Sequence, residues 1–485
     1  MLKYRKFAHF FSSGFHGLAL LAFVNFAIIG VRNLVLSKLL GPGDYGINSL
    51  SSQILSFLAF LDFGAVALLQ REIPRNIEDI ARTELVLFQI RRITFRSYLV
   101  SSVALLVTLL FLNLMHISHW NLAIVAALII FPIQNTLVFK MAVLNSTRRQ
   151  SQALRLLTAS SAINFILTFI FYHLFGLWII LVAPFLGFLC SQLIFKRNLP
   201  HLPLRKIMFV HPDFTQRDIF SDMKSVFGSN LAAYVLQNVD FYLALFSQSQ
   251  VNVGLVGFAL NILSLIPVLP IIISNKMSPI LNERSERFSI ENKLHLILKM
   301  RDSIVYVAGF ATLFAAGFAS ISIKHFFTSY TDAVPIIWIF GVSFFIYTST
   351  FFTSTFALFI DKQSEIFRIQ STSILFESII LLLFLFFFHI NLIVIASISI
   401  ARSIFYLELT RKFVKRNLFN SNMVLRFFRL KIGLYALMLI GCGVIAEQKN
   451  EALLNLGLSI SLVIYLSQFR KQWRRFNLAF ADVAN

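Results

Sequence analysis

Cysteine is almost absent from this sequence. Its 485 residues include only Cys190 and Cys442, and both lie within apolar stretches. Two isolated thiols exclude a disulfide framework and a thiolate metal site. No other grouping suggests a bound ion or coenzyme, so we expect no metal and no cofactor.

Charge is also scarce, and it is mostly of one sign. Charged residues make up 13% of the chain, with 22 acidic residues against 43 Lys and Arg, whereas hydrophobic residues make up 57%. With a mean hydropathy of +0.77, the chain has too few polar residues to cover a water-soluble globule. The basic residues occur in short runs between apolar stretches, which is typical of membrane orientation signals and does not indicate nucleic-acid binding.

Long apolar runs predict an all-α integral membrane protein. A helix needs about 20 residues to cross a hydrocarbon core of about 30 Å. Fourteen runs meet this length, the last two only barely, so the chain has twelve or fourteen spans. They lie near 14–39, 46–70, 95–115, 122–146, 154–174, 177–195, 225–247, 253–277, 303–325, 335–360, 370–389, 391–410, 431–446 and 453–469.

The basic residues predict the orientation of these spans. Alternate loops carry nearly all of the Lys and Arg, whereas the loops on the opposite side carry only Lys38, Lys324 and Lys449. Cytoplasmic loops of membrane proteins carry more Lys and Arg than the loops on the opposite side. We therefore expect both termini in the cytoplasm.

One inner segment divides the chain. Residues 196–224 are basic, contain three prolines and fall between the sixth and seventh spans. We predict an N-terminal six-helix bundle at 1–195, a cytoplasmic basic linker at 196–224, a C-terminal six-helix bundle at 225–410, and an extra helix pair with a basic tail at 411–485. An offset of 208 residues brings Gly46 onto Gly254 and Arg32 onto Asp240, which suggests duplicated bundles.

Several short motifs carry a family resemblance. Residues 39–46 read LLGPGDYG, residues 62–64 read DFG, and Arg71-Glu72 follows. Residues 238–240 read NVD in the seventh span, and residues 330–335 read YTDAVP before the tenth. In this order, and with this hydropathy profile, the chain resembles bacterial polysaccharide flippases of the O-antigen translocase (Wzx) type.

The resemblance implies the multidrug, oligosaccharidyl-lipid and polysaccharide exporter superfamily. Its members have two six-helix bundles around a central cavity, and its polysaccharide branch moves polyprenyl-diphosphate-linked oligosaccharides from the inner to the outer leaflet. It also implies that the protein lies in the bacterial cytoplasmic membrane, surrounded by membrane lipids. Transport would be coupled to protons or sodium ions, and polysaccharide polymerase machinery would be a partner. An extra helix pair also occurs in lipid II flippases of the same superfamily, so a lipid II flippase is an alternative.

Two other functions are compatible with a polytopic membrane protein. A small-molecule or drug antiporter on the same fold would be expected to use acidic binding residues without deep cations. A membrane enzyme such as a polymerase or ligase would be expected to carry a large outer loop, and all the predicted outer loops are short. We therefore expect a transporter and no enzyme activity.

Charges within the spans are the candidate functional residues, because they are costly in hydrocarbon. Three are proposed as cavity cations that bind substrate: Arg32, Lys140 and Arg402. Three are proposed as coupling or salt-bridge acids: Asp62, Asp240 and Glu377. Polar residues one or two helical turns away would line the same cavity: Asn25, Gln237, Gln370 and Ser373.

Alternatives remain for each charge. Asp62 has apolar neighbours on its helix and can serve as a structural hydrogen-bonding acid. The other charges can form buried salt bridges between helices, with or without lining a cavity. By the offset of 208, Arg32 and Asp240 are expected either to approach each other across the cavity or to find nearer partners in their own bundles.

Overall fold

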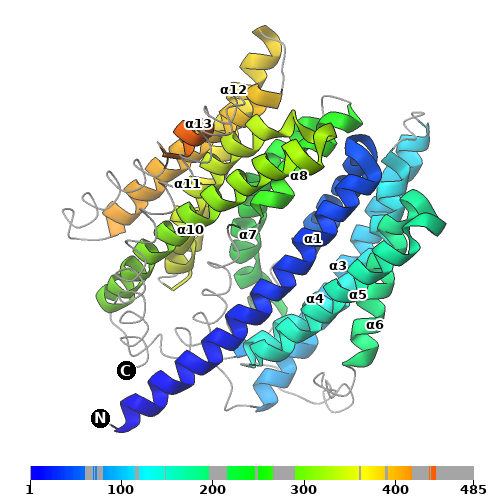
Figure 1. The fold of residues 1–485 in the computed structure, drawn as a ribbon. Helices are drawn as coiled ribbons and strands as arrows, with labels where there is room; N and C mark the ends of the chain where they lie inside the picture. The colour runs from blue at the N-terminus through cyan, green and yellow to red at the C-terminus, as the bar shows by residue number, and fades with distance from the viewer. Residues whose placement is uncertain are drawn as a thin grey trace. The chain divides into compact units, whose positions relative to one another are not determined.

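In a computed structural model the chain is helical. The structure describes residues 2–60, 69, 72–73, 80–114, 120–147, 149–195, 216–245, 249–264, 266, 290–359, 362–387, 392–417, 436 and 438–443. Within these ranges every regular element is a helix (Figure 1). A helix satisfies its backbone hydrogen bonds within one segment, which hydrocarbon surroundings demand.

The helices agree with the first twelve predicted spans. They are α1 (Leu2–Phe60), α3 (Ile80–Leu114), α4 (Asn121–Ser146), α5 (Gln150–Phe175), α6 (Ile179–Ile194), α7 (Gln216–Leu245), α8 (Gln250–Leu263), α10 (Ile290–Phe326), α11 (Ala333–Phe359), α12 (Gln363–Phe387) and α13 (Leu392–Asn417). Short 3-10 turns join α5 to α6 and α10 to α11. Apart from residues 436 and 438–443, the last predicted pair lies outside the described residues.

Five stretches of the described chain are long and apolar enough to cross a membrane. They are Val86–Phe111, Asn121–Ser146, Gln150–Ile194, Ala333–Thr350 and Leu392–Val414. The stretch Gln150–Ile194 contains both α5 and α6. Length and composition therefore support a multi-pass membrane protein.

The LLGPGDYG motif marks a break within α1. Gly41 has φ 70° and ψ 173°, values that a side chain rarely permits, and Pro42 follows it. A proline suits the first turn of a new helix. Tyr172 on α5 donates a hydrogen bond of 2.8 Å to the carbonyl of Leu39, which lies just before the break. The motif thus ends the first predicted span and starts the second.

The described helices form two compact units. The N-terminal unit contains α1 from Ser12, α3 to α6, and α7 up to Tyr234; the C-terminal unit contains the rest of α7, α8 and α10 to α13. The predicted linker lies outside the described residues up to 215, and from Gln216 it is part of α7. The predicted domain boundaries remain a prediction.

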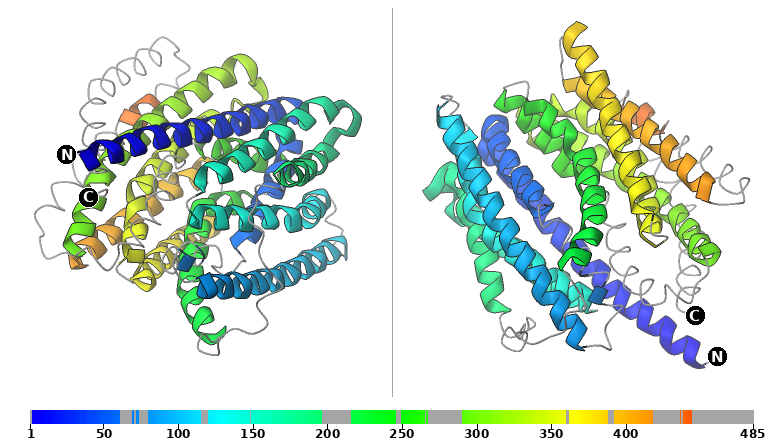
Figure 2. Two further views of the ribbon diagram at one scale, coloured as in Figure 1. Left: turned by 90° about the horizontal axis from the view of Figure 1, so that it is seen from below. Right: turned by 180° about the vertical axis from the view of Figure 1, so that it is seen from behind.

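In the N-terminal unit, α4 packs against α3, α5 and α6, and α5 packs along α6 (Figure 2). Gly187 makes the last contact possible, because a β-carbon there would lie 2.9 Å from the carbonyl oxygen of Ser160. The core between these helices includes Ala127, Ile130 and Phe131. Small residues allow helices to approach closely in a membrane, where hydrophobicity alone does not drive them together.

In the C-terminal unit, α11 packs against α8, α10, α12 and α13, and α12 packs against α13. Helix α12 shows how the side chains are divided: Leu375, Ile379 and Leu383 are exposed, whereas Gln370, Ser373 and Glu377 are fully buried. This is the reverse of a water-soluble helix and suits one surrounded by lipid. The polar interior of this unit contains the site described next.

Candidate functional site

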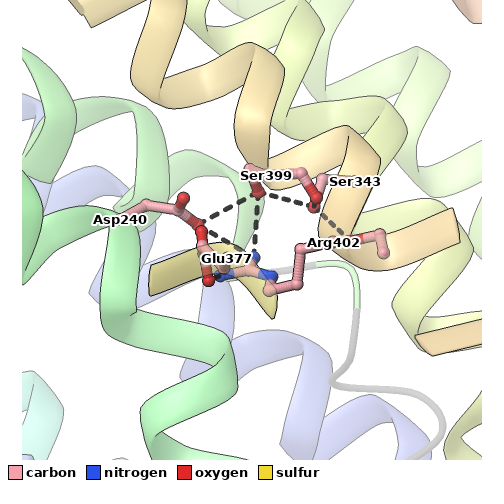
Figure 3. A network of polar contacts seen from close by, with 6 residues as sticks. Asp240, Ser343, Glu377, Ser399 and Arg402 are labelled. Carbon is pink, nitrogen blue, oxygen red and sulfur yellow. Dashed lines mark hydrogen bonds and ion pairs between the residues drawn. The ribbon is translucent and has the colours of Figure 1, made fainter. Parts of the chain in front are cut away.

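Three charged side chains meet inside the C-terminal unit (Figure 3). Arg402 on α13 donates through Nη1 to Oε2 of Glu377 on α12 at 2.8 Å. Through Nη2 it donates to Oδ2 of Asp240 on α7 at 3.0 Å. Arg402 is 4% exposed and both acids are 0% exposed. One guanidinium therefore bridges two carboxylates from two other helices.

Serines extend this cluster. Ser399 donates to Oδ2 of Asp240 at 3.1 Å and accepts from Nη2 of Arg402 at 2.9 Å. The hydroxyl of Ser343 on α11 lies 2.8 Å from that of Ser399 and 2.6 Å from that of Ser403. The cluster thus includes side chains from α7, α11, α12 and α13.

The sequence of α13 explains how this helix contributes several residues to the cluster. Ser399, Arg402, Ser403 and Tyr406 are three or four residues apart, which places them on one helical face. All four are buried, whereas Ile404 on another face is exposed. The polar face therefore turns towards α7, α11 and α12.

The cluster has one positive group and two acids. With both acids ionised its formal charge is −1. One oxygen of each acid, Oδ1 of Asp240 and Oε1 of Glu377, is buried without a hydrogen-bond partner. A buried charge without a partner is costly, so one proton or one small cation would stabilise the cluster.

The polar neighbours predicted around these acids lie in the same unit. Gln370 is fully buried, and its amide nitrogen and oxygen lack hydrogen-bond partners. Ser373 donates to the carbonyl of Ile369 at 2.9 Å. Gln237, one turn before Asp240 on α7, donates to the hydroxyl of Tyr347 at 2.9 Å. The ring of Tyr347 stacks on that of Tyr406.

Lys140 lies in the N-terminal unit, separate from this cluster. Its Nζ donates to Oε1 of Gln192 on α6 at 2.7 Å, and Nε2 of Gln192 donates to the carbonyl of Ile133 at 3.0 Å. Gln192 is uncharged, so this bond positions the ammonium group without neutralising it. Among the described residues no acid forms an ion pair with Lys140.

The N-terminal unit contains a second cation in α1. The Nε of Arg32 is buried without a hydrogen-bond partner, and within the described part of the chain Arg32 has no ion pair. Asn25, two turns earlier, is buried, and its side-chain oxygen also lacks a partner. Asp62 lies outside the described residues.

The ion pairs bear on the acid of the predicted pair Arg32 and Asp240. Asp240 is bonded to Arg402 and Ser399 of its own unit, as the alternative of a nearer partner expects, and the approach of Arg32 stays a prediction. Arg402, proposed as a cation for substrate, is already neutralised by two carboxylates. Among the described residues, no acid forms an ion pair with the predicted cavity cations Lys140 and Arg32.

Sequence reasoning missed Gln192, Ser343 and Tyr347. Each is a neutral polar residue in an apolar span, which is common and carries no signal by itself. Its neighbours on the same helix, Ser191 and Phe188, do not indicate that the side chain of Gln192 faces Lys140. Only the packing of α4 against α6 brings the two together.

Solved structures of transporters share this fold. A mutant of VcmN, a MATE transporter of Vibrio cholerae, matches with a TM-score of 0.56 and 13% identity over 86% of this chain and 99% of that chain. An outward-facing multidrug resistance MATE family transporter of the MOP superfamily matches with a TM-score of 0.59 and 15% identity over 84% and 96%. A MATE structure in the bent conformation has a TM-score of 0.55 and 16% identity over 82% and 94%.

The family follows from the sequence itself. No curated protein matches the chain. Residues 13–281, more than half of the chain, match the family described as "Polysaccharide biosynthesis protein". The matched segment includes the break at Gly41, the cations Arg32 and Lys140, and Asp240. This chain, an all-α membrane protein with the fold of MATE transporters, belongs to the polysaccharide biosynthesis protein family.

Proposed function

We propose that this protein is a flippase that moves a polyprenyl-diphosphate-linked oligosaccharide from the inner to the outer leaflet of the bacterial cytoplasmic membrane. The observation that carries the proposal is Lys140, a cation within a membrane span that is held by a neutral amide and paired with no described acid. Family membership supports a polysaccharide-related cargo.

The chemistry of such a cargo explains why cations are needed. A lipid-linked sugar carries a diphosphate anion and a polar glycan, and neither crosses hydrocarbon unaided. Lys140 and Arg32 would replace part of the water around the diphosphate with charge-assisted hydrogen bonds. Asn25, on the face of α1 that carries Arg32, would offer its side chain to the cargo's hydroxyl groups.

Energy for directional movement would come from an ion gradient. The Asp240–Arg402–Glu377 cluster has one acid more than it has cations, and each acid has one free oxygen. A proton or a sodium ion would bind there when the protein is open to one side of the membrane. Because binding neutralises the cluster, it would favour one arrangement of α7, α12 and α13 over another.

The orientation belongs to the same proposal. With both termini in the cytoplasm, the N-terminal end of α3 lies at the inner face, and glycan would emerge on the side where polymerase machinery uses it.

Two alternatives differ in the cargo. The lipid II-type flippase differs only in the glycan carried. A small-molecule antiporter would have no need of Lys140 and Arg32 as cations that no described acid neutralises.

The test is the fate of lipid-linked glycan when the gene is inactivated. We expect the lipid-linked oligosaccharide to accumulate on the inner leaflet, shielded from a glycan-binding reagent applied outside intact spheroplasts. Re-expression of the chain should restore labelling from outside. Normal glycan display in the inactivated strain, together with increased sensitivity to cationic drugs, would replace the flippase with a drug antiporter.

A further inference from the structure

Buried polar side chains of α12 and α13 continue beyond the charged cluster towards one end of the C-terminal unit. Four of them follow within about two helical turns, and each is at most 1% exposed: Ser373 and Gln370 on α12, Tyr406 and Thr410 on α13. In the opposite direction, the buried residues one turn further along the same helices are apolar: Leu381, Ile395 and Ala396. The polar side chains thus lead to the end where α12 begins and α13 ends, which the predicted orientation places at the inner face.

Gln370 and Thr410 lie at the same level of the two helices. Helix α13 begins five positions after α12 ends, and helices joined by so short a connection run antiparallel. Near the cluster, Phe376 of α12 stacks on Phe405 of α13 with the ring centroids 4.3 Å apart. Gln370 is six positions back from this ring pair on α12, and Thr410 is five positions forward on α13. The two buried side chains therefore come opposite each other.

Both side chains have unused hydrogen-bonding groups. Within the described part of the chain, Oε1 and Nε2 of Gln370 and Oγ1 of Thr410 are buried without a hydrogen-bond partner. A buried polar group without a partner is costly. A buried water makes about three hydrogen bonds to groups that would otherwise be unsatisfied. These three groups therefore suit a bound water between α12 and α13.

An apolar layer lies between this pair and the inner end of the helices. One turn beyond Gln370 and Thr410, the buried residues are Ile366 on α12 and Phe413 and Val414 on α13, each at most 4% exposed. The charged residues near this end are at least partly exposed: Lys362, Glu365, Arg368, Glu408 and Arg411. A polar site closed off in this way suits single bound waters better than an open channel.

Two tyrosines lie between the pair and the cluster. Tyr406 is on α13, one turn after Arg402, and its ring stacks on that of Tyr347 on α11. Gln237 of α7 donates to the hydroxyl of Tyr347. Of the described residues, these tyrosines and the three charged groups of the cluster are the titratable side chains next to the route, and each of the packed helices α7, α11, α12 and α13 contributes one of them.

The cluster itself favours a proton over a metal ion. Oδ1 of Asp240 and Oε1 of Glu377 lack partners, whereas the other oxygen of each acid is bonded to Arg402. A sodium ion at these oxygens would lie beside the guanidinium group in a region of low dielectric constant, where like charges repel strongly. A proton on one carboxylate brings the formal charge of the cluster to zero and places no second cation beside Arg402.

We propose that Gln370 and Thr410 hold bound water that passes protons between the cluster and the inner face, which makes the coupling ion a proton. A hydronium ion at the inner face gives up one proton along this route and becomes water, and Oε1 of Glu377 or Oδ1 of Asp240 gains an O–H bond. The inference rests on the ion coupling in the proposed function and names the ion and its route. Gln370 and Thr410 are positioning residues, because they act through the water.

Infrared spectroscopy of hydrogen–deuterium exchange tests the route without any glycan. The purified full chain in phosphatidylcholine nanodiscs is held at a pH at which the cluster is protonated, and the buffer is changed rapidly from water to heavy water. The shift of the carboxylic-acid C=O band then gives the exchange rate. Loss of this band in Glu377→Gln or in Asp240→Asn assigns it to the cluster, and we expect one such band in the unchanged chain.

Matched variants separate the route from the general stability of the helices. Gln370→Leu and Thr410→Val should slow the exchange about tenfold, the effect of losing one hydrogen bond on the route. Thr410→Ser keeps the hydroxyl group and should exchange at the normal rate. Thr372→Val is the control on the exposed face of α12, where the Thr372 hydroxyl bonds to the carbonyl of Arg368. All variants are compared at equal folded amount by gel filtration.

The outcomes are distinct. Normal exchange in folded Gln370→Leu and Thr410→Val would overturn the water site, and Thr410→Val against Thr410→Ser decides alone if Gln370→Leu does not fold. No carboxylic-acid band from the cluster, or a band removed at constant pH by sodium chloride and not by choline chloride, would overturn the proton. Because exchange needs no transport, slowed exchange in the variants of a protein whose inactivation leaves glycan display intact would refute the flippase and keep the proton route.

Discussion

Arg402 and Asp240 are 162 positions apart in the sequence, yet Nη2 of the first lies 3.0 Å from Oδ2 of the second, in a region with almost no solvent access. Glu377 holds the other arm of the same guanidinium. The three side chains join α7, α12 and α13 within one unit. This cluster has consequences for stability and for coupling that can be measured separately.

Arg402→Gln should destabilise the protein. It removes the only cation of the cluster and leaves two buried carboxylates facing each other, a change that costs about 3 to 5 kcal/mol. We expect strongly reduced abundance in the membrane and early unfolding in detergent. Thermal denaturation of the purified protein measures the unfolding. The triple change Arg402→Gln, Asp240→Asn and Glu377→Gln should recover most of the lost abundance, because it leaves no unpaired charge.

Arg411→Gln is the matched control for this variant. Arg411 and Glu408 form an ion pair on the same helix, but both side chains are partly exposed. Exposed pairs contribute about 1 kcal/mol or less. If Arg411→Gln lowered abundance as much as Arg402→Gln, burial of the charge would not explain the effect.

Glu377→Gln should separate transport from its energy source. The amide keeps the shape of the acid and can still accept from Arg402, while the formal charge of the cluster changes from −1 to zero. We expect near-normal abundance and glycan movement that no longer responds to the ion gradient. The measurement is transport into vesicles with an imposed proton or sodium gradient. Full gradient dependence in this variant would remove Glu377 from coupling.

Much of the fold could be predicted from sequence because hydrocarbon imposes simple rules. Spans of fixed length, interrupted by basic runs, gave helices that the structure contains from α1 to α13. The break at 39–46 was visible because Gly41 and Pro42 disfavour a continuous helix. These features depend on local sequence and on the surrounding lipid, and hardly on contacts between distant segments.

The site was only partly predictable, for a physical reason. Asp240, Glu377 and Arg402 stand out as charges in apolar spans, so the sequence identified them. Their pairing depends on how α7, α12 and α13 pack, and hydropathy does not contain that information. The offset of 208 compares positions along the chain, so it does not indicate that Arg402 of the same unit bonds to Asp240.

Lys140→Gln should impair transport and leave stability largely intact. Among the described residues its ammonium group bonds to neutral Gln192 and to no acid, so an amide can occupy the same place without creating an unpaired acid. Loss of one charge-assisted contact of about 1.5 to 3 kcal/mol should reduce glycan export by about 10- to 100-fold at equal abundance. Lys38→Gln, an exposed cation on α1, serves as the control. Loss of protein in place of loss of export would make Lys140 structural.

Gly187→Ala should loosen the contact of α5 with α6. The added β-carbon would meet the carbonyl oxygen of Ser160 at 2.9 Å and the β-carbon of Asn164 at 3.0 Å. Overpacking of this kind costs about 1 to 3 kcal/mol. Gly30→Ala is the counterpart, because among the described residues no atom beyond the adjacent backbone of its own helix lies within 4 Å of its added carbon. Thermal unfolding in detergent should show a lower midpoint for Gly187→Ala alone.

The central claim is movement of a lipid-linked glycan, and reconstitution measures it without other cell components. The purified chain is placed in phospholipid vesicles that carry a polyprenyl-diphosphate-linked oligosaccharide with a fluorescent sugar. An impermeant reductant then destroys the fluorescence of the outer leaflet. Vesicles with the protein and an ion gradient should lose fluorescence beyond the outer-leaflet fraction, and vesicles with Lys140→Gln should lose little more than that fraction. Equal loss with and without protein, under either a proton or a sodium gradient, would contradict the account.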